Sequence, residues 1–214
     1  LGSGEDGMTF LNRVRRSKRE KQYVTRLGNS TEHELVVLVD DNNNEIGTAP
    51  KDSVHTTNTP LHRGFSLFLF NSRKEVLLTK RAKSKKTFPG VWTNTVCGHP
   101  GPGERVVDAA KRRLKEELGI DLPQKRLNPE SVQGLTLHEP NEVICVVAPY
   151  RYRFADNNGI LENETCPILV AYADIDPYPA NDEVEEWKWM RWEEFLEEVK
   201  REPDIYSPWC TEES

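Results

Sequence analysis

The sequence predicts a single-domain, mixed α/β sandwich. Short apolar runs typical of buried strands alternate with two stretches that have helical periodicity. No internal repeat divides the chain, and no linker separates one part of it from another. The 214 residues are enough to fill one hydrophobic core. We therefore expect one compact α/β domain.

The N-terminal residues differ in composition from the rest of the chain. Residues 1–32 contain the strongly basic stretch 13–26, which predicts a flexible, basic extension ahead of a domain at residues 33–214. A targeting segment or a nucleic-acid-binding arm is the less favoured interpretation of the basic stretch.

The predicted strands are separated by turns rich in Asn, Asp, Gly and Ser. A buried-strand pattern precedes the turn DDNNNEIG, and two further runs joined by the polar turn SRK predict a hairpin. Two longer runs flank the turn ADNNG, and an alternating run near the C-terminus predicts an edge strand followed by an amphipathic helix. The predicted strands are residues 34–40, 65–71, 75–81, 143–154, 164–174 and 184–190, and the C-terminal helix is residues 192–200.

Residues 88–120 begin with a strand-like run, continue through a loop rich in Gly and Pro, and end in a helix closed by Gly119. Apolar residues recur there at helical spacing and predict a buried face. Arg113 and Glu117 are four residues apart, so they share one edge of this face. A simple salt bridge on a solvated helix, worth about 0.3–0.5 kcal/mol, is the alternative interpretation of that pair. The residues of the predicted buried face are Val107, Ala110, Leu114 and Leu118.

Charge and hydropathy exclude several classes of protein. The formal net charge of -6 gives no electrostatic reason to expect a nucleic-acid partner. No apolar run approaches the roughly 18 residues that a membrane span needs, and the mean hydropathy is -0.70. The four cysteines form neither a CxxC pair nor a dense disulfide framework, so we expect a reducing, cytoplasmic setting.

Three histidines and two glutamates form a possible metal site. His55 and His62 lie in the loop VHTTNTPLHR, and His99 lies further on, in the segment CGHP. If the run LENET is extended, Glu162 and Glu164 project on the same side and both can reach one ion. Imidazole and carboxylate donors suit Mn²⁺ or Mg²⁺, with Zn²⁺ possible. A hairpin rim that carries two solvated glutamates is the alternative.

The stretch 88–120 resembles the Nudix box, a loop and helix that holds divalent metal against a diphosphate. Its spacing matches that box except at one position, where Arg113 stands in place of an expected Glu. The surrounding segments TNTVCGHP, LENETCP and SPW resemble the type I isopentenyl diphosphate isomerases, Nudix relatives that move a double bond. The resemblance extends from about Glu34 to Trp209, which is most of the chain. The residues that keep the spacing of the box are Gly98, Glu104, Arg112, Glu116, Glu117 and Gly119.

The resemblance implies a Nudix-type sandwich and an enzyme of isoprenoid biosynthesis that interconverts isopentenyl and dimethylallyl diphosphate. It implies that Cys97 and Glu164 transfer protons on opposite faces of the allylic unit of the substrate. Tyr152 matches the tyrosine that hydrogen-bonds the acidic glutamate, and Trp209 matches the aromatic residue that faces the carbocation. The alternatives are a small buried cysteine at position 97 and a tryptophan that attaches the C-terminal tail to the core.

The resemblance also implies how the rest of the substrate is bound. It places the three histidines, Glu162 and Glu164 on one metal ion, and a second ion, Mg²⁺, between Glu117 and the diphosphate oxygens. The implied diphosphate-binding cations are Lys51, Arg81, Lys85 and Arg113, for which a solvated basic patch is the alternative.

The expected partner is a small allylic or homoallylic diphosphate, with no redox cofactor, nucleic acid or membrane, and we expect a monomer or weak dimer. Two other functions stay open at this point. One is a Nudix diphosphate hydrolase, and the other is a non-catalytic module that only binds a diphosphate.

Overall fold

The computed structural model describes residues 34–122, 143–179 and 182–214. The basic extension expected at residues 1–32 lies outside these ranges, so the extension and its boundary stay predictions. Within the described ranges, no helix combines the length and the apolar character that crossing a membrane requires.

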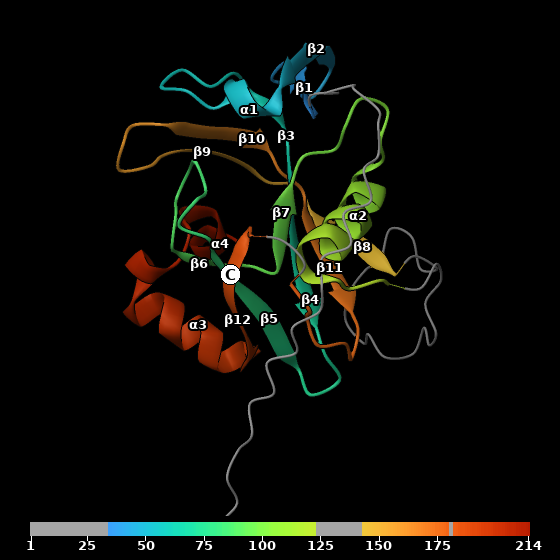
Figure 1. The fold of residues 1–214 in the computed structure, drawn as a ribbon, viewed down its shortest axis with the longest axis vertical. Helices are drawn as coiled ribbons and strands as arrows, with labels where there is room; N and C mark the ends of the chain where they lie inside the picture. The colour runs from blue at the N-terminus through green and yellow to red at the C-terminus, as the bar shows by residue number, and fades with distance from the viewer. Residues whose placement is uncertain (1–33, 123–142, 180–181) are drawn as a thin grey trace, which may run out of the picture. The chain divides into compact units, whose positions relative to one another are not determined.

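Two mixed β-sheets form the framework of the described residues (Figure 1). The five-stranded sheet has the order β2-β1-β3-β10-β9, and the seven-stranded sheet has the order β12-β5-β4-β11-β8, with β6 beside β5 and β7 beside β4. The pairs β3–β10 and β4–β11 are parallel, whereas the other strand pairs are antiparallel. The strands are β1 (Leu35–Val39), β2 (Glu45–Pro50), β3 (His62–Arg63), β4 (Phe65–Phe70), β5 (Glu75–Arg81), β6 (Trp92–Thr93), β7 (Val96–Gly98), β8 (Ile144–Ala148), β9 (Arg151–Ala155), β10 (Leu161–Thr165), β11 (Ile168–Tyr172) and β12 (Val184–Arg191).

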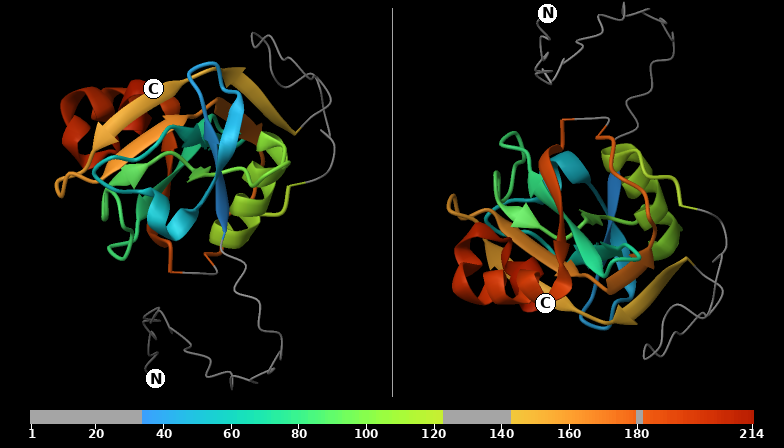
Figure 2. Two further views of the ribbon diagram at one scale, coloured as in Figure 1. Left: turned by 90° about the horizontal axis from the view of Figure 1, so that it is seen from above. Right: turned by 90° about the horizontal axis from the view of Figure 1, so that it is seen from below.

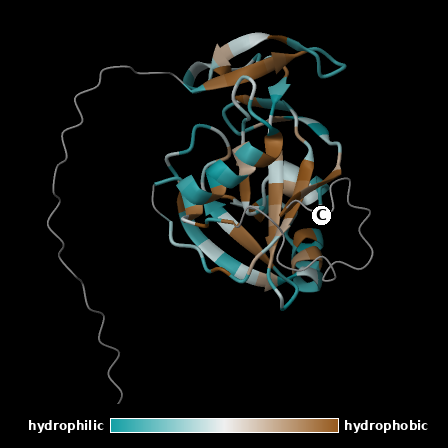
Figure 3. Ribbon diagram, turned by 90° about the vertical axis from the view of Figure 1, so that its right-hand side faces the viewer, coloured by the Kyte–Doolittle hydropathy of each residue, from teal (hydrophilic) through white to brown (hydrophobic). Residues whose placement is uncertain are grey.

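Helices cover both faces of the seven-stranded sheet, as Figures 1 and 2 show. Alternate residues of β4 point to opposite faces, so Leu67 and Leu69 pack with the helix α2 while Phe68 packs on the other face with α3 and α4. Figure 3 shows hydrophobic residues along the strands and hydrophilic ones on the outer side of α2. The helices are α1 (Lys51–Val54), α2 (Val106–Leu118), α3 (Trp192–Arg201), the 3₁₀ turn η2 (Pro203–Ile205) and α4 (Pro208–Glu212). The predicted single-domain α/β sandwich is therefore confirmed for the described residues.

Two predicted strands are each divided between the two sheets. The run 143–154 breaks at Pro149 into β8 and β9, and the run 164–174 breaks at Pro167 into β10 and β11. Proline has no N–H group to donate to a ladder, so each run leaves one sheet at its proline and enters the other. The two halves keep their antiparallel pairing, β8 with β11 and β9 with β10. This bent hairpin joins the sheets and places the C-terminal end of β10 at their junction.

The other predicted elements lie where the sequence placed them. Strands 34–40, 65–71, 75–81 and 184–190 correspond to β1, β4, β5 and β12, and helix 192–200 corresponds to α3. β12 is an edge strand, as its alternation predicts. The predicted buried face of α2 is confirmed, because Val107, Ala110, Leu114 and Leu118 all lie in the hydrophobic core.

α2 ends at Gly119, which has a φ of 66°. Its N–H donates to the carbonyl of Lys115, and the N–H of Ile120 donates to that of Leu114, so the last turn of the helix is capped by backbone groups. A Cβ atom at position 119 would lie 2.7 Å from the backbone carbonyl oxygen of Tyr178. Both the left-handed backbone and this close approach require glycine there.

Replacement of Gly119 by alanine is therefore expected to destabilise the fold more than the same replacement at a glycine that has a positive φ but no close neighbour. Gly103 is the matched control, since its φ is 73° and a Cβ there has no neighbour within 4 Å. We expect Gly103→Ala to lower the free energy of unfolding by about 1–2 kcal/mol. Gly119→Ala should cost at least about 1 kcal/mol more, because backbone must move to admit the methyl group. Urea unfolding followed by tryptophan fluorescence measures both free energies of unfolding. Equal decreases for the two variants would show that the backbone at Tyr178 moves away at no cost.

Candidate active site

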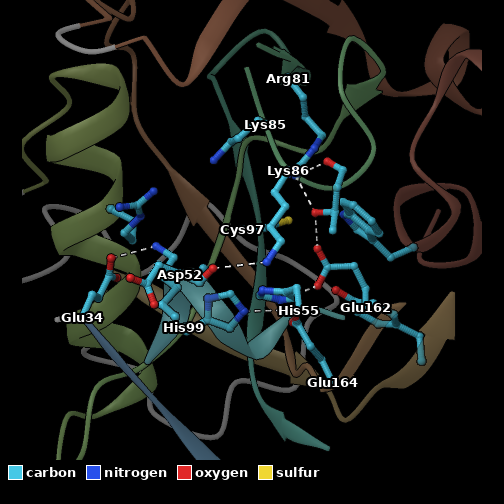
Figure 4. Close-up of a pocket in the computed structure, with 16 residues that line it drawn as sticks. Glu34, Asp52, His55, Arg81, Lys85, Lys86, Cys97, His99, Glu162 and Glu164 are labelled. Carbon is cyan, nitrogen blue, oxygen red and sulfur yellow. Dashed lines mark hydrogen bonds and ion pairs between the residues drawn. The ribbon is translucent and has the colours of Figure 1, made fainter. Parts of the chain in front are cut away.

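Side chains from both sheets and from helices line one cavity of about 380 Å³ (Figure 4). Its volume falls within the roughly 300–1,000 Å³ that is usual for small-molecule sites. Every predicted site residue lines it except His62 and Glu117, which contact the lining residues His99 and Arg113. The lining residues without a predicted role in the site are Glu34, Asp52, Lys86, Thr87 and Gly98.

The predicted metal ligands converge. Each of His55, His62, His99, Glu162 and Glu164 offers one ligand atom, and these atoms all lie within 4.8 Å of one another. All five side chains are buried. Strand alternation explains the two carboxylates, since Glu162 and Glu164 project from the same face of β10. The solvated hairpin rim considered from the sequence is therefore not what the structure shows.

The polar atoms of this cluster are incompletely satisfied by one another. The Nε2 atom of His55 and the Oε2 atom of Glu162 are buried and 2.9 Å apart, yet neither has a hydrogen-bond partner of acceptable geometry among the described residues. The Nε2 atoms of His62 and His99 face each other at 3.3 Å. An unsatisfied buried polar atom costs about 1–3 kcal/mol, and a cation among these lone pairs would satisfy several at once. The three imidazole and two carboxylate groups therefore fit a divalent metal ion.

Neighbouring groups orient the ligands. The Nδ1 atom of His62 lies 2.9 Å from the carbonyl oxygen of Pro60, and a hydrogen bond there leaves Nε2 with its lone pair free for the cluster. Thr87 donates a hydrogen bond of 2.5 Å to Oε1 of Glu162. Gly64 leaves the space that Glu164 fills, because a Cβ atom there would lie 1.7 Å from Oε2 of Glu164.

Cys97 and Glu164 line the same cavity in opposite protonation states. Burial raises the pKa of the Cys97 thiol to about 12, and the nearby Glu213 carboxyl adds to the rise. Burial also raises the pKa of Glu164, but His99 and His62 outweigh it and hold that pKa well below its usual range. At neutral pH the cavity thus contains a thiol that holds its proton and a carboxylate that accepts one.

Asn94 connects the thiol to the aromatic wall of the cavity. Its Oδ1 atom accepts hydrogen bonds from Sγ of Cys97 at 3.1 Å and from Nε1 of Trp209 at 3.3 Å. Its Nδ2 atom donates to two backbone carbonyls that flank it. Asn94 was not among the residues predicted from the sequence. The only local indication of its role is its position in TNTVCGHP, three residues before Cys97.

The aromatic wall consists of Trp209 and Tyr152, and Phe88 packs against Trp209. The Trp209 ring is stacked on Tyr152 at a centroid distance of 5.6 Å, and Phe88 meets it edge-on at 5.2 Å. Trp209 is only 2% exposed but lines the cavity, so it serves both as a core residue and as part of the wall. Tyr152 lies opposite Glu164 across the β9–β10 pair. Burial and the charge of Glu164 raise the Tyr152 pKa well above its usual value, so its hydroxyl stays protonated.

Three of the four predicted diphosphate cations are paired with carboxylates. Lys51 donates to Glu34 at 2.9 Å, Lys85 donates to Glu183 at 2.5 Å, and Arg113 donates to Glu183 at 2.6 Å as well as to Glu117. The fourth, Arg81, donates to the backbone carbonyls of residues 87 and 88, and its guanidinium carbon lies 5.4 Å from the centroid of the Trp209 ring.

Arg113 is a buried residue rather than the surface partner of Glu117 that the alternative interpretation required. Burial lowers its pKa, but Glu117 and Glu183 outweigh burial and raise the pKa above the usual arginine value. Glu104, which had no role from the sequence, accepts two hydrogen bonds of 2.9 Å from Arg112 and one of 2.8 Å from the N–H of Gly101. It thereby fixes the loop before α2 to the helix.

Comparison with known proteins agrees with this geometry. Residues 60–210 match the NUDIX domain family. The isopentenyl-diphosphate Delta-isomerase of Corynebacterium efficiens is 44% identical over 186 residues, which are 86% of this chain and 90% of that protein. The enzyme of the same name from Paenarthrobacter aurescens is 44% identical over 178 residues, covering 82% and 86% of the two chains.

Among solved structures, that of DR0079 from Deinococcus radiodurans is similar with a TM-score of 0.54 and 17% identity, over 79% of this chain and 90% of that one. This likeness concerns the fold alone. The match of the NUDIX domain and the identity to the curated relatives over most of both chains lead to one conclusion: the chain belongs to the Nudix superfamily and, within it, to the isopentenyl-diphosphate Delta-isomerase family.

Proposed function

We propose that the protein interconverts isopentenyl diphosphate and dimethylallyl diphosphate by moving one carbon–carbon double bond. The observation that carries this proposal is that Cys97 and Glu164 line one cavity, where burial raises the pKa of the thiol and the neighbouring histidines lower that of the carboxyl. The reaction adds a proton to one carbon and removes a proton from another, with no net oxidation. It therefore needs one group that holds a proton and one that accepts it.

The aromatic wall suits the intermediate of this reaction. Protonation of the terminal alkene carbon leaves a tertiary carbocation, and loss of a proton from the carbon next to the one that bears the diphosphate forms the new double bond. A desolvated cation over an aromatic face is stabilised by about 2 kcal/mol or more. The stacked rings of Trp209 and Tyr152 supply such faces next to Cys97 and Glu164, and their bulk keeps water from the cation.

The His/Glu cluster is proposed to hold Mn²⁺ or Mg²⁺, with Zn²⁺ possible, through His55, His62, His99, Glu162 and Glu164. When bound, this ion supplies positive charge that favours the carboxylate form of Glu164. Lys51, Arg81, Lys85 and Arg113 are proposed to bind the diphosphate, and Glu117 to hold Mg²⁺ against it. The His/Glu cluster proposed to act near the alkene end and the cations proposed to bind the diphosphate end thus contribute residues to the lining of one cavity.

We also infer a cytoplasmic setting, supported by the free thiols of Cys97 and Cys166 in the immediate surroundings of the site. The inferred partner is a small allylic or homoallylic diphosphate.

Incubation with isopentenyl diphosphate in heavy water tests the proposal. The expected product is deuterated dimethylallyl diphosphate, observed by NMR, since the group that delivers the proton exchanges with solvent. Release of inorganic phosphate would instead identify a hydrolase, and unchanged substrate would identify a module that only binds.

Loss of a metal ligand is expected to weaken metal retention. His62→Ala or Glu162→Gln removes one of five convergent donors, so we expect at least tenfold weaker Mn²⁺ binding, a scale usual for damage to a metal site. Elemental analysis after gel filtration and the rise in melting temperature on adding Mn²⁺ are the measurements. Glu45→Gln, which changes an exposed carboxylate in β2, is the control. Retention of a full equivalent of metal by His62→Ala would contradict the site.

Removal of either proton carrier should slow turnover. Cys97→Ala and Glu164→Gln are each expected to reduce kcat by about 10²–10⁴, the usual scale for a positioned acid or base. Affinity for pyrophosphate should change little in Cys97→Ala, because the thiol directs its hydrogen bond to Asn94. Cys145→Ala, which removes a thiol from β8, should keep near-normal turnover. A Cys97→Ala enzyme as fast as Cys145→Ala would show that Cys97 is merely packed.

Arg113→Glu restores the acidic residue that the Nudix box places after Arg112. It removes a charge-assisted donor worth about 1.5–3 kcal/mol and adds a negative charge beside the diphosphate. We expect kcat/KM on isopentenyl diphosphate to fall at least tenfold, mainly through a higher KM. Arg113→Lys should be intermediate, since it keeps the charge but loses the planar fork of donors. Equal efficiencies for wild type, Arg113→Lys and Arg113→Glu would exclude a role in substrate binding.

A further inference from the structure

One carboxylate oxygen lies between two of the cations assigned to the diphosphate. The Oε2 atom of Glu183 is 2.5 Å from Nζ of Lys85 and 2.6 Å from Nη2 of Arg113. Both cationic side chains line the cavity. A diphosphate oxygen that contacted Lys85 and Arg113 together would have to lie at hydrogen-bond distance from the same two nitrogens. Glu183 therefore provides, from within the chain, the contact expected of the substrate.

The charges confirm that this carboxylate is ionised. Burial raises the pKa of Glu183, but hydrogen bonding by Lys85 and the charges of Lys85 and Arg113 outweigh it and lower that pKa to about 2. Glu183 keeps partial access to solvent, because its side chain is 31% exposed. An exposed carboxylate can be rehydrated when it is displaced, whereas the buried Glu117 cannot without moving α2.

We propose that Glu183 is an internal competitor of the diphosphate, which the substrate must displace from Lys85 and Arg113 and which returns as the product leaves. This inference rests on the proposed diphosphate site and goes beyond it by naming a residue that limits affinity. Glu183 occupies one hydrogen-bonding position on each of two cations before the substrate binds, so only a ligand with enough negative charge to replace it gains their contacts.

The test is the affinity for inorganic pyrophosphate, measured by calorimetry at one fixed Mg²⁺ concentration. Glu183→Gln keeps the size of the side chain and removes its charge, so binding should become about tenfold tighter, the effect of removing competition for one charge-assisted contact. Glu183→Ala should shift affinity in the same direction, which excludes an effect of the new amide. Glu185→Gln is the matched control, since Glu185 lies two residues further on, in β12, and forms its ion pair with the exposed Lys83, at 3.7 Å. It should leave the affinity unchanged.

Two further measurements separate competition from a general effect of charge. In a Lys85→Met background the gain from Glu183→Gln should shrink at least threefold, because one of the contested contacts is already absent. With isopentenyl diphosphate, Glu183→Gln should lower KM without raising kcat, since the substrate and transition state gain the same contact.

Weaker pyrophosphate binding by Glu183→Gln would overturn the inference and make Glu183 a residue that orients the cations or assists the bound metal. Unchanged binding would overturn it as well. If wild-type protein failed to bind pyrophosphate at all, the proposed function would fail too, whereas binding by wild type without a gain in Glu183→Gln would refute this inference alone.

Discussion

The burial of five metal-type ligands is the constraint on which the site depends. Three imidazoles and two carboxylates lie with their ligand atoms within 4.8 Å of one another, and all five side chains are buried. Such a cluster is unfavourable unless the lone pairs find partners. The bent hairpin makes the cluster possible, since Pro167 lies just beyond the end of β10, where the chain turns into the other sheet. β3 then pairs with β10 in parallel and brings His62 beside Glu164.

The same arrangement divides the cavity by chemistry. In our proposal, Cys97, Glu164 and the aromatic rings of Tyr152 and Trp209 contact the hydrocarbon end of the substrate, while Lys85 and Arg113 contact its charged end. Arg81 lies at the boundary, since it is near the Trp209 ring and hydrogen-bonded to backbone carbonyls. In our proposal a short substrate with one apolar and one anionic end spans both parts.

The parts of the site that depend on local spacing were predictable from the sequence. The buried face of α2 follows from helical periodicity, and the common side of Glu162 and Glu164 follows from strand alternation. The assembly of the histidines was inferred from the family resemblance, because loop residues carry no periodic signal. The division of the two long strands escaped prediction because an apolar run does not state which sheet it joins, although Pro149 and Pro167 marked the breaks. Glu183 was missed because it meets Lys85 and Arg113 across 98 and 70 residues of sequence.

The departure at position 113 has a physical consequence for the helix itself. Glu117 is buried, and burial raises its pKa, so α2 carries at its inner edge a carboxyl that needs a positive charge beside it. Arg113 provides that charge from one helical turn away, and its guanidinium also forms an ion pair with Glu183. A glutamate at position 113 would place three carboxyls together, and the helix edge would then depend on bound cations for neutrality. Position 113 thus decides whether the charge that neutralises this edge is built into the protein or recruited from solution. In our proposal the arginine leaves a metal ion at Glu117 available for the diphosphate, since the helix does not need that ion to fold.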